Sequence, residues 1–144
     1  MAAWKKTRSI TELNEMCLGT IHDSLGITFT AIEDGKLSAS MPVGPSVRQP
    51  FGLLHGGASV VLAESLGSMA AFLSIEEGEL ALGVEVNANH LLAVRTGTVT
   101  GTATPLTIGR QLHVWSIEIR NDQAALVCVC RLTVLVKPAR PISA

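Results

Sequence analysis

The chain has 144 residues, enough for one domain with a substantial core, and its formal net charge is −1. The near-neutral charge excludes the basic surface that nucleic-acid binding requires, and the scarcity of aromatic residues, at 3%, argues against base stacking. Charged residues amount to only 16%. A domain this poor in charge is expected to bury additional surface in an oligomer.

The first half of the chain is predicted to hold a short helix, a hairpin and one long helix. Ser9–Glu12 has the spacing of a capping box, and apolar residues then recur at helical intervals. Residues 26–33 and 36–41 are typical of two hairpin strands joined by an acidic turn. Residues 42–50, rich in Pro, Gly and Ser, form a predicted loop, and an apolar helix follows over 56–75.

The second half is predicted to be β-structure, with strands over 80–91, 98–104, 110–120 and 125–136. In 98–104 four threonines alternate with Val, Gly and Ala, which predicts a polar and an apolar face. In the next strand Trp115, Ile117 and Ile119 share one face. Residues 1–137 are expected to form the single domain, and 138–144, with two prolines, a flexible tail.

These elements predict an α+β fold. One long buried helix and about six strands, mostly antiparallel because their connections are short, must bury their apolar faces together. A single helix fills such a core only if the sheet curls around it. We therefore expect a curved antiparallel sheet wrapped on a central helix.

The cysteines and the N-terminus indicate the compartment. Cys17, Cys128 and Cys130 fit a reducing environment better than a disulfide framework, and the last two are predicted to share one face of a strand as small core residues. The N-terminus has no apolar segment after its first charges, as a signal peptide would. Residues 56–75 are long enough to span a membrane, but they contain Glu64 and several Gly and Ser residues. We expect a soluble, cytoplasmic protein without membrane partners.

Glu64 is the single charge in the apolar helix. An isolated carboxylate taken out of water is costly, and semi-buried acids of this kind often serve as general bases or nucleophiles. Alternatively, Glu64 lies at the rim of a packed helix and points to water, or bonds to Ser68 one turn later. The residues that precede the helix favour the catalytic interpretation.

The run from Gln49 to Ser68, in which His55-Gly56-Gly57 is followed by Glu64, is similar to the hotdog-fold acyl-CoA thioesterases. It most resembles the bacterial branch that acts on aryl- and hydroxynaphthoyl-CoA and includes the enterobactin proofreading thioesterases. The likeness covers nearly the whole chain, through Asn87–His90 to Val114–Ile119. The spacing from His-Gly-Gly to Glu is specific, whereas His-Gly-Gly alone is a weak signal. The resemblance implies the hotdog fold, with the curved sheet of about six strands around one long central helix.

The resemblance also implies the catalytic roles. Glu64 matches the family's base or nucleophile, and the backbone N–H of Gly56 matches the donor to the substrate carbonyl. Gln49 and His55 match positions that orient the thioester, and Ser68 matches one that helps to place water or substrate. Without the resemblance Gln49 would be a loop residue, His55 a helix-entry residue, and Ser68 would bond to the carbonyl four residues earlier.

Coenzyme A contacts are implied at further positions, namely Gly83, His90, Leu91, Leu92, Thr107, Ile108, Gly109, Arg110 and Gln111. Arg110 would contact a phosphate, or else it is a solvated charge at a strand end. This chain has Leu91-Leu92-Ala93 where relatives often carry a basic residue, so it departs from the family pattern there. No cofactor is implied beyond the CoA of the substrate. No metal is expected either, because the four histidines show no ligand spacing with Cys or acidic residues.

Helix geometry predicts a site shared between two subunits. Gly56 and Glu64 are eight residues apart, which separates them by about 12 Å along a helix, whereas reacting atoms must lie about 3–3.5 Å apart. A carbonyl held at Gly56 must therefore be attacked by Glu64 of another copy. A homodimer is thus expected to be obligatory, and the resemblance adds a sheet continuous across the dimer and assembly into a tetramer.

The expected reaction is hydrolysis of an acyl-CoA or acyl-carrier-protein thioester, with aryl acyl groups favoured by the resemblance. Glu64 would deprotonate water or attack directly to form a mixed anhydride, and the sequence leaves both open. Three alternative functions are a hotdog hydratase or dehydratase, a non-catalytic acyl-CoA-binding module and a packing-only oligomer scaffold. The scaffold does not explain why Gln49, His55, Gly56 and Glu64 occur together.

Overall fold

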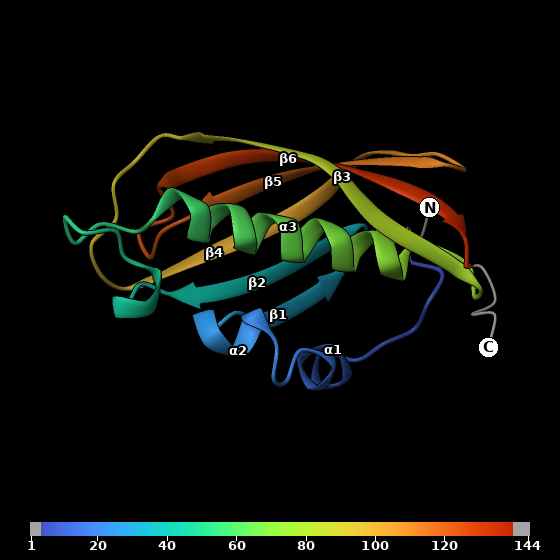
Figure 1. Ribbon diagram of the computed structural model, residues 1–144, viewed down its shortest axis with the longest axis horizontal. Coiled ribbons are helices and arrows are strands. Elements are labelled where there is room, and N and C mark those ends of the chain that lie inside the picture. The colour runs from blue at the N-terminus through green and yellow to red at the C-terminus, as the bar shows by residue number, and fades with distance from the viewer. Residues whose placement is uncertain (1–3, 140–144) are drawn as a thin grey trace.

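Six antiparallel strands curl around one long helix (Figure 1). The computed structural model describes residues 4–139. The strands follow the order β1-β2-β4-β5-β6-β3 and every neighbouring pair is antiparallel. Their bounds are β1 Thr28–Glu33, β2 Lys36–Pro42, β3 Glu79–His90, β4 Thr98–Ile108, β5 Leu112–Arg120 and β6 Leu126–Pro138. The predicted α+β architecture is confirmed.

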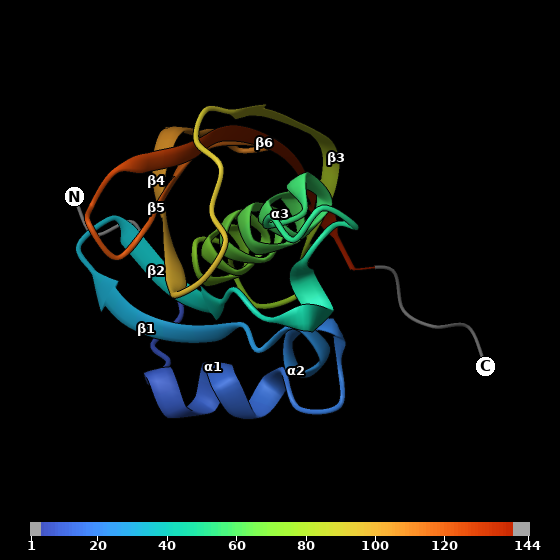
Figure 2. The same cartoon turned by 90° about the vertical axis from the view of Figure 1, so that its left-hand side faces the viewer.

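The central helix α3, Gly56–Leu73, lies inside the curve of the sheet, as the view along its axis shows (Figure 2). Its buried residues occupy most of its circumference, which explains why the segment is apolar nearly all round. By length and composition α3 could cross a membrane, a test that the core helices of soluble proteins also pass. Half of its residues are buried within the fold.

Two glycines let α3 approach the sheet closely. A Cβ added to Gly67 of α3 would lie 2.5 Å from a methyl group of Leu132 in β6. A Cβ added to Gly101 of β4 would lie 2.6 Å from a methyl group of Leu66. The inward residues of β5 complete this core: Trp115, Ile117 and Ile119 are fully buried, as their alternation predicts.

Two short helices cover the outside of β1 and β2 (Figure 2). Helix α1, Ile10–Met16, begins with the predicted capping box, in which Ser9 and Glu12 bond to each other's backbone N–H groups. The Asn14 side chain then pairs with the backbone of Phe29, at 3.0 Å to its oxygen and 2.8 Å to its nitrogen. This contact fixes α1 on β1.

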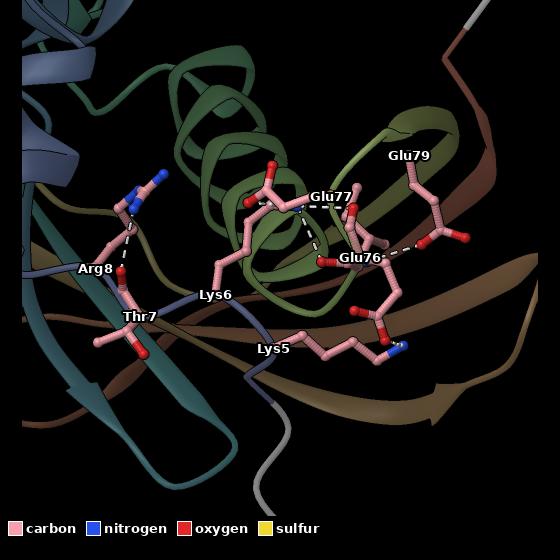
Figure 3. Close-up of polar contacts among 8 residues, drawn as sticks. Lys5, Lys6, Thr7, Arg8, Glu76, Glu77 and Glu79 are labelled. Carbon is pink, nitrogen blue, oxygen red and sulfur yellow. Dashed lines mark hydrogen bonds and ion pairs between the residues drawn. The ribbon is translucent and has the colours of Figure 1, made fainter.

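Residues 4–8, which we name the N-terminal strap, close the far end of α3 (Figure 3). The backbone N–H groups of Lys5 and Lys6 donate to the Leu73 carbonyl at 2.7 and 3.0 Å. The Lys6 ammonium group is nearly buried and donates to the Ile75 and Glu76 carbonyls, both at 3.0 Å. The strap therefore satisfies the Leu73 carbonyl, which the helix end leaves unpaired, and two carbonyls of the segment that follows.

Several boundaries differ from the sequence predictions. A helix α2, Ile21–Leu25, and a 3₁₀ turn η1, Pro45–Val47, were not predicted. Strand β1 begins at 28 rather than 26 because Gly26, at φ +69°, ends α2 in the left-handed conformation. The central helix ends at Leu73 rather than 75.

The β-structure of the second half is longer than predicted in two places. Strand β4 continues past 104 to Ile108, because a bulge at Pro105–Thr107 carries the pairing beyond the proline. Strand β6 includes Pro138, and the Ala139 N–H donates to the Gly78 carbonyl at 2.8 Å, so the predicted tail starts too early. The rest of that tail, 140–144, lies outside the described residues.

Candidate active site

A cavity of about 380 Å³ lies at the start of α3. Its lining includes Gln49, Gly56 and His90, together with Leu91 and Leu92. Gly56 is the first residue of α3, and its N–H has no hydrogen-bond partner among residues 4–139. A free N–H at the positive end of a helix is suited to bind an oxygen that gains negative charge.

Gln49 is held by its own loop. Its side-chain oxygen accepts from the backbone N–H groups of Phe51 at 2.5 Å and Leu53 at 3.3 Å. Gly52, at φ +80°, makes the turn between them. Because the amide oxygen is occupied, the amide nitrogen of Gln49 remains available as a donor in the cavity.

His55 is the N-cap of α3. Its Nδ1 accepts from the Gly57 N–H at 2.8 Å, so the helix-entry role that the sequence left open is present. An imidazole that accepts at Nδ1 carries its proton on Nε2 when neutral. The exposed His55 ring therefore keeps one N–H for another partner.

Glu64 lies half-buried in the middle of α3 and faces β3. The Ser68 hydroxyl donates to its Oε1 at 3.0 Å, so Ser68 bonds to the carboxylate and not to the carbonyl one turn earlier. The carboxylate also sits directly against Gly83, where any Cβ would overlap Oε1. Gly83, expected to contact CoA, thus provides the space for the Glu64 side chain.

The two groups of predicted catalytic residues remain separate within one chain. Gln49 and Gly56 line the cavity at the start of α3, with His55 as the adjacent N-cap, whereas Glu64 and Ser68 do not line it. The eight-residue interval along a continuous helix corresponds to about 12 Å. One chain therefore brings Gln49, His55 and Gly56 together and, separately, Glu64 and Ser68.

The predicted CoA residues also divide into groups. His90, Leu91 and Leu92 lie at the start of α3, whereas Thr107–Arg110 line a larger cavity of about 760 Å³ at its other end, beside Ser74 and Ile75. Gln111, in the turn that follows, accepts from the Val136 N–H at 2.9 Å. The structure does not unite these groups within one chain.

Sequence reasoning missed several residues of these cavities. Lys5 and the buried His113 line the larger cavity with Arg110, and Ser59 and Val127 line the smaller one. Only the folding of the strap and of β5 over the end of α3 brings Lys5 and His113 together, so no local motif could have identified them. Burial lowers the pKa of His113.

Within residues 4–139 no three His, Cys, Asp or Glu side chains come together as metal ligands. The expectation that the site uses no metal remains a prediction.

Known proteins resemble this chain in sequence and in fold. The family model described as "Thioesterase superfamily" matches residues 51–128. A proofreading thioesterase EntH of Klebsiella pneumoniae is 46% identical over 130 residues, which cover 90% of this chain and 95% of that protein.

Solved structures give the same result. A thioesterase of Haemophilus influenzae superposes with a TM-score of 0.95 at 44% identity, and the match covers 100% of both chains. A mutant thioesterase of Pseudomonas aeruginosa superposes with a TM-score of 0.93 at 48% identity, covering 94% of this chain and 99% of that one.

The chain belongs to the Thioesterase superfamily and has its hotdog fold. It is a thioesterase, an enzyme that hydrolyses thioesters. The hydratase and binding-module alternatives are therefore not favoured.

Proposed function

We propose that this thioesterase hydrolyses acyl-CoA thioesters, with aryl or related acyl groups, in a site formed by two copies of the chain. One copy supplies Gln49, His55 and the Gly56 N–H, and the other supplies Glu64 and Ser68. The observation that carries the proposal is the Gly56 N–H, which has no hydrogen-bond partner among residues 4–139 and lies at a cavity. The half-buried Glu64 carboxylate is on the same helix but eight residues away, too far to act on a carbonyl bound there.

The proposed reaction follows from these groups. The thioester carbonyl oxygen accepts from the Gly56 N–H, and the helix dipole stabilises the negative charge that develops on it. The amide nitrogen of Gln49 and Nε2 of His55 donate to the thioester and hold its plane. Glu64 of the other copy deprotonates a water molecule or attacks the carbonyl carbon, and Ser68 orients the carboxylate through its hydrogen bond.

The edge strand β3 supports the dimer. It ends the sheet next to β6, and its outer edge has no neighbouring strand within residues 4–139. Leu80, Leu82 and Val84 are 43%, 40% and 56% exposed on this strand. A long apolar edge of this kind is prone to pair with another strand. Antiparallel pairing of two β3 strands would extend the sheet and set the two α3 helices in opposite directions.

The same two-fold arrangement supports the CoA contacts. Thr107–Arg110 lie at the far end of α3 within one chain. In the dimer they would lie near His90 and Leu91 of the other copy. Arg110 and Lys5 would then face the phosphates, while the leucines would contact the apolar part of the pantetheine arm. A tetramer of two dimers and a cytoplasmic location remain predictions.

Thiol release from a panel of thioesters tests the proposed function. The panel is benzoyl-CoA, a hydroxynaphthoyl-CoA, medium- and long-chain acyl-CoAs, and an acyl-carrier-protein adduct. We expect the aryl-CoAs to be preferred and Glu64→Gln to lose at least about 100-fold in kcat, because the amide keeps the Ser68 bond but cannot act as base or nucleophile.

Glu15→Gln is the matched control, since Glu15 is an exposed acid on α1. It should hydrolyse the panel at the wild-type rate. A folded Glu64→Gln protein with normal turnover would refute the role of Glu64, and preference for the carrier-protein adduct would refute CoA as the carrier.

A further inference from the structure

His90 is held between a buried thiol and the start of α3. It ends β3 and pairs across the sheet with Cys128 of β6. Its Nδ1 lies 3.5 Å from the Cys128 Sγ, which in turn lies 3.5 Å from the Cys130 Sγ. Cys128 and Cys130 are 0% and 2% exposed, so this row of polar atoms leads from the core to the ring.

The other edge of the His90 ring covers Gly56. A Cβ added to Gly56 would lie 2.9 Å from Nε2 and 3.0 Å from Cε1 of His90. Both residues line the cavity at the start of α3. Nε2 therefore lies against the backbone of Gly56, the residue whose N–H the proposed function assigns to the thioester carbonyl.

The position of the ring proton follows from counting donors. Burial raises the pKa of Cys128, and that of Cys130 to about 12, so both remain thiols at neutral pH. If Cys130 donates to Cys128 and Cys128 donates to Nδ1 of His90, every donor in the row has an acceptor. If Nδ1 of His90 instead donated to Cys128 and Cys128 donated to Cys130, the Cys130 S–H would have no acceptor among the described residues.

We propose that Cys128 is a positioning residue that fixes the His90 ring and keeps its proton on Nε2, which donates to the thioester carbonyl beside the Gly56 N–H. The Nε2–H of His90 would thereby add a further donor to the oxyanion site at the Gly56 N–H. With the proton on Nδ1, the Nε2 lone pair would instead repel that oxygen. The inference rests on the proposed function for the identity of the ligand, but not for the state of the ring.

The state of the ring is measured first, in the wild-type protein without substrate. Long-range ¹H–¹⁵N correlation spectra distinguish the protonated nitrogen of a neutral imidazole from the unprotonated one, and His90→Gln assigns the signals. In the neutral ring we expect the proton on Nε2 and an unprotonated Nδ1. A proton on Nδ1 would overturn the proposal, whatever the enzyme hydrolyses.

Kinetics with benzoyl-CoA then test the positioning role. Cys128→Ala should lower kcat at least about tenfold with little change in KM, because one oxyanion donor is no longer aligned. Cys128→Ser should restore most of the loss, because its hydroxyl can donate to Nδ1. Cys17→Ala, a buried cysteine beside α1, should leave kcat unchanged.

A double-mutant cycle separates this role from packing. In the His90→Gln background, Cys128→Ala should have no further effect on kcat, since its effect passes through the ring. Additive losses, or equal losses for Cys128→Ala and Cys128→Ser, would overturn the proposal. If the wild type does not hydrolyse benzoyl-CoA, the aryl-CoA function fails while the spectra still decide the state of His90.

Discussion

The residue with the strongest structural constraint near Glu64 is Gly83. The carboxylate occupies the volume of the missing side chain, and the Ser68 hydroxyl donates to the same oxygen, Oε1. Gly83→Ala should therefore displace the carboxylate and lower kcat/KM by up to about 100-fold, as small misplacements of a reacting group can. Hydrolysis of the preferred thioester measures the loss.

Gly44→Ala is the control for that substitution, because a Cβ at Gly44 has nothing within 4 Å and its φ is ordinary. It should retain wild-type activity. If Gly83→Ala also retains wild-type activity, while circular dichroism shows an intact fold, the contact of Glu64 with Gly83 of β3 has no part in catalysis.

The sequence predicted contacts at helical spacing and missed contacts between distant segments. The Glu64–Ser68 hydrogen bond follows from an interval of four residues on one helix. The contacts of Glu64 with Gly83, and of Gly56 with His90, depend on where β3 lies along α3. No local pattern sets that register, so Gly83 could not be assigned to the acid from sequence.

Among the elements, the N-terminal strap binds the end of α3 and the segment that follows it. Lys6 donates to two carbonyls at the helix end while its ammonium group lies 4.9 Å from the centre of the Phe72 ring. Lys6→Met should lower the free energy of unfolding by about 1.5–3 kcal/mol, because hydrogen bonds from a charged donor are lost. Chemical denaturation measures this change.

Lys5→Met is the comparison within the same strap. The Lys5 ammonium pairs with Glu76 at 3.0 Å, but its side chain is 47% exposed, so the loss should stay below about 1 kcal/mol. A loss below about 1 kcal/mol for both substitutions would show that the strap holds the end of α3 through its backbone alone.

Element prediction succeeded where periodicity or capping was strong. The apolar helix, the capping box of α1 and the alternation in β4 and β5 are confirmed. Helix α2 was missed because it has only five residues and buries none of them, so it shows no hydrophobic period. Strand β4 was predicted to be too short because a proline usually ends a strand. Here Pro105 lies at a bulge and the pairing continues beyond it.

At the scale of the whole molecule, under the proposed function, one chain contains two incomplete halves of a site. The carbonyl-binding cavity and the Glu64–Ser68 pair lie along one helix, and the exposed edge of β3 runs beside it. A two-fold dimer through β3 would join each half to its complement. The low charge of the sequence predicts an oligomer, but the edge that we propose as its interface became visible only from the strand order.

Subunit complementation tests this central claim most directly. Glu64→Gln and Gln49→Ala are each expected to be nearly inactive, and the two proteins are unfolded together, refolded and assayed as a mixture. Random pairing gives heterodimers with one intact site, so the mixture should recover about a quarter of the wild-type activity per chain. No recovery above the separate variants, with dimers formed, would place the whole site within one chain and contradict the account.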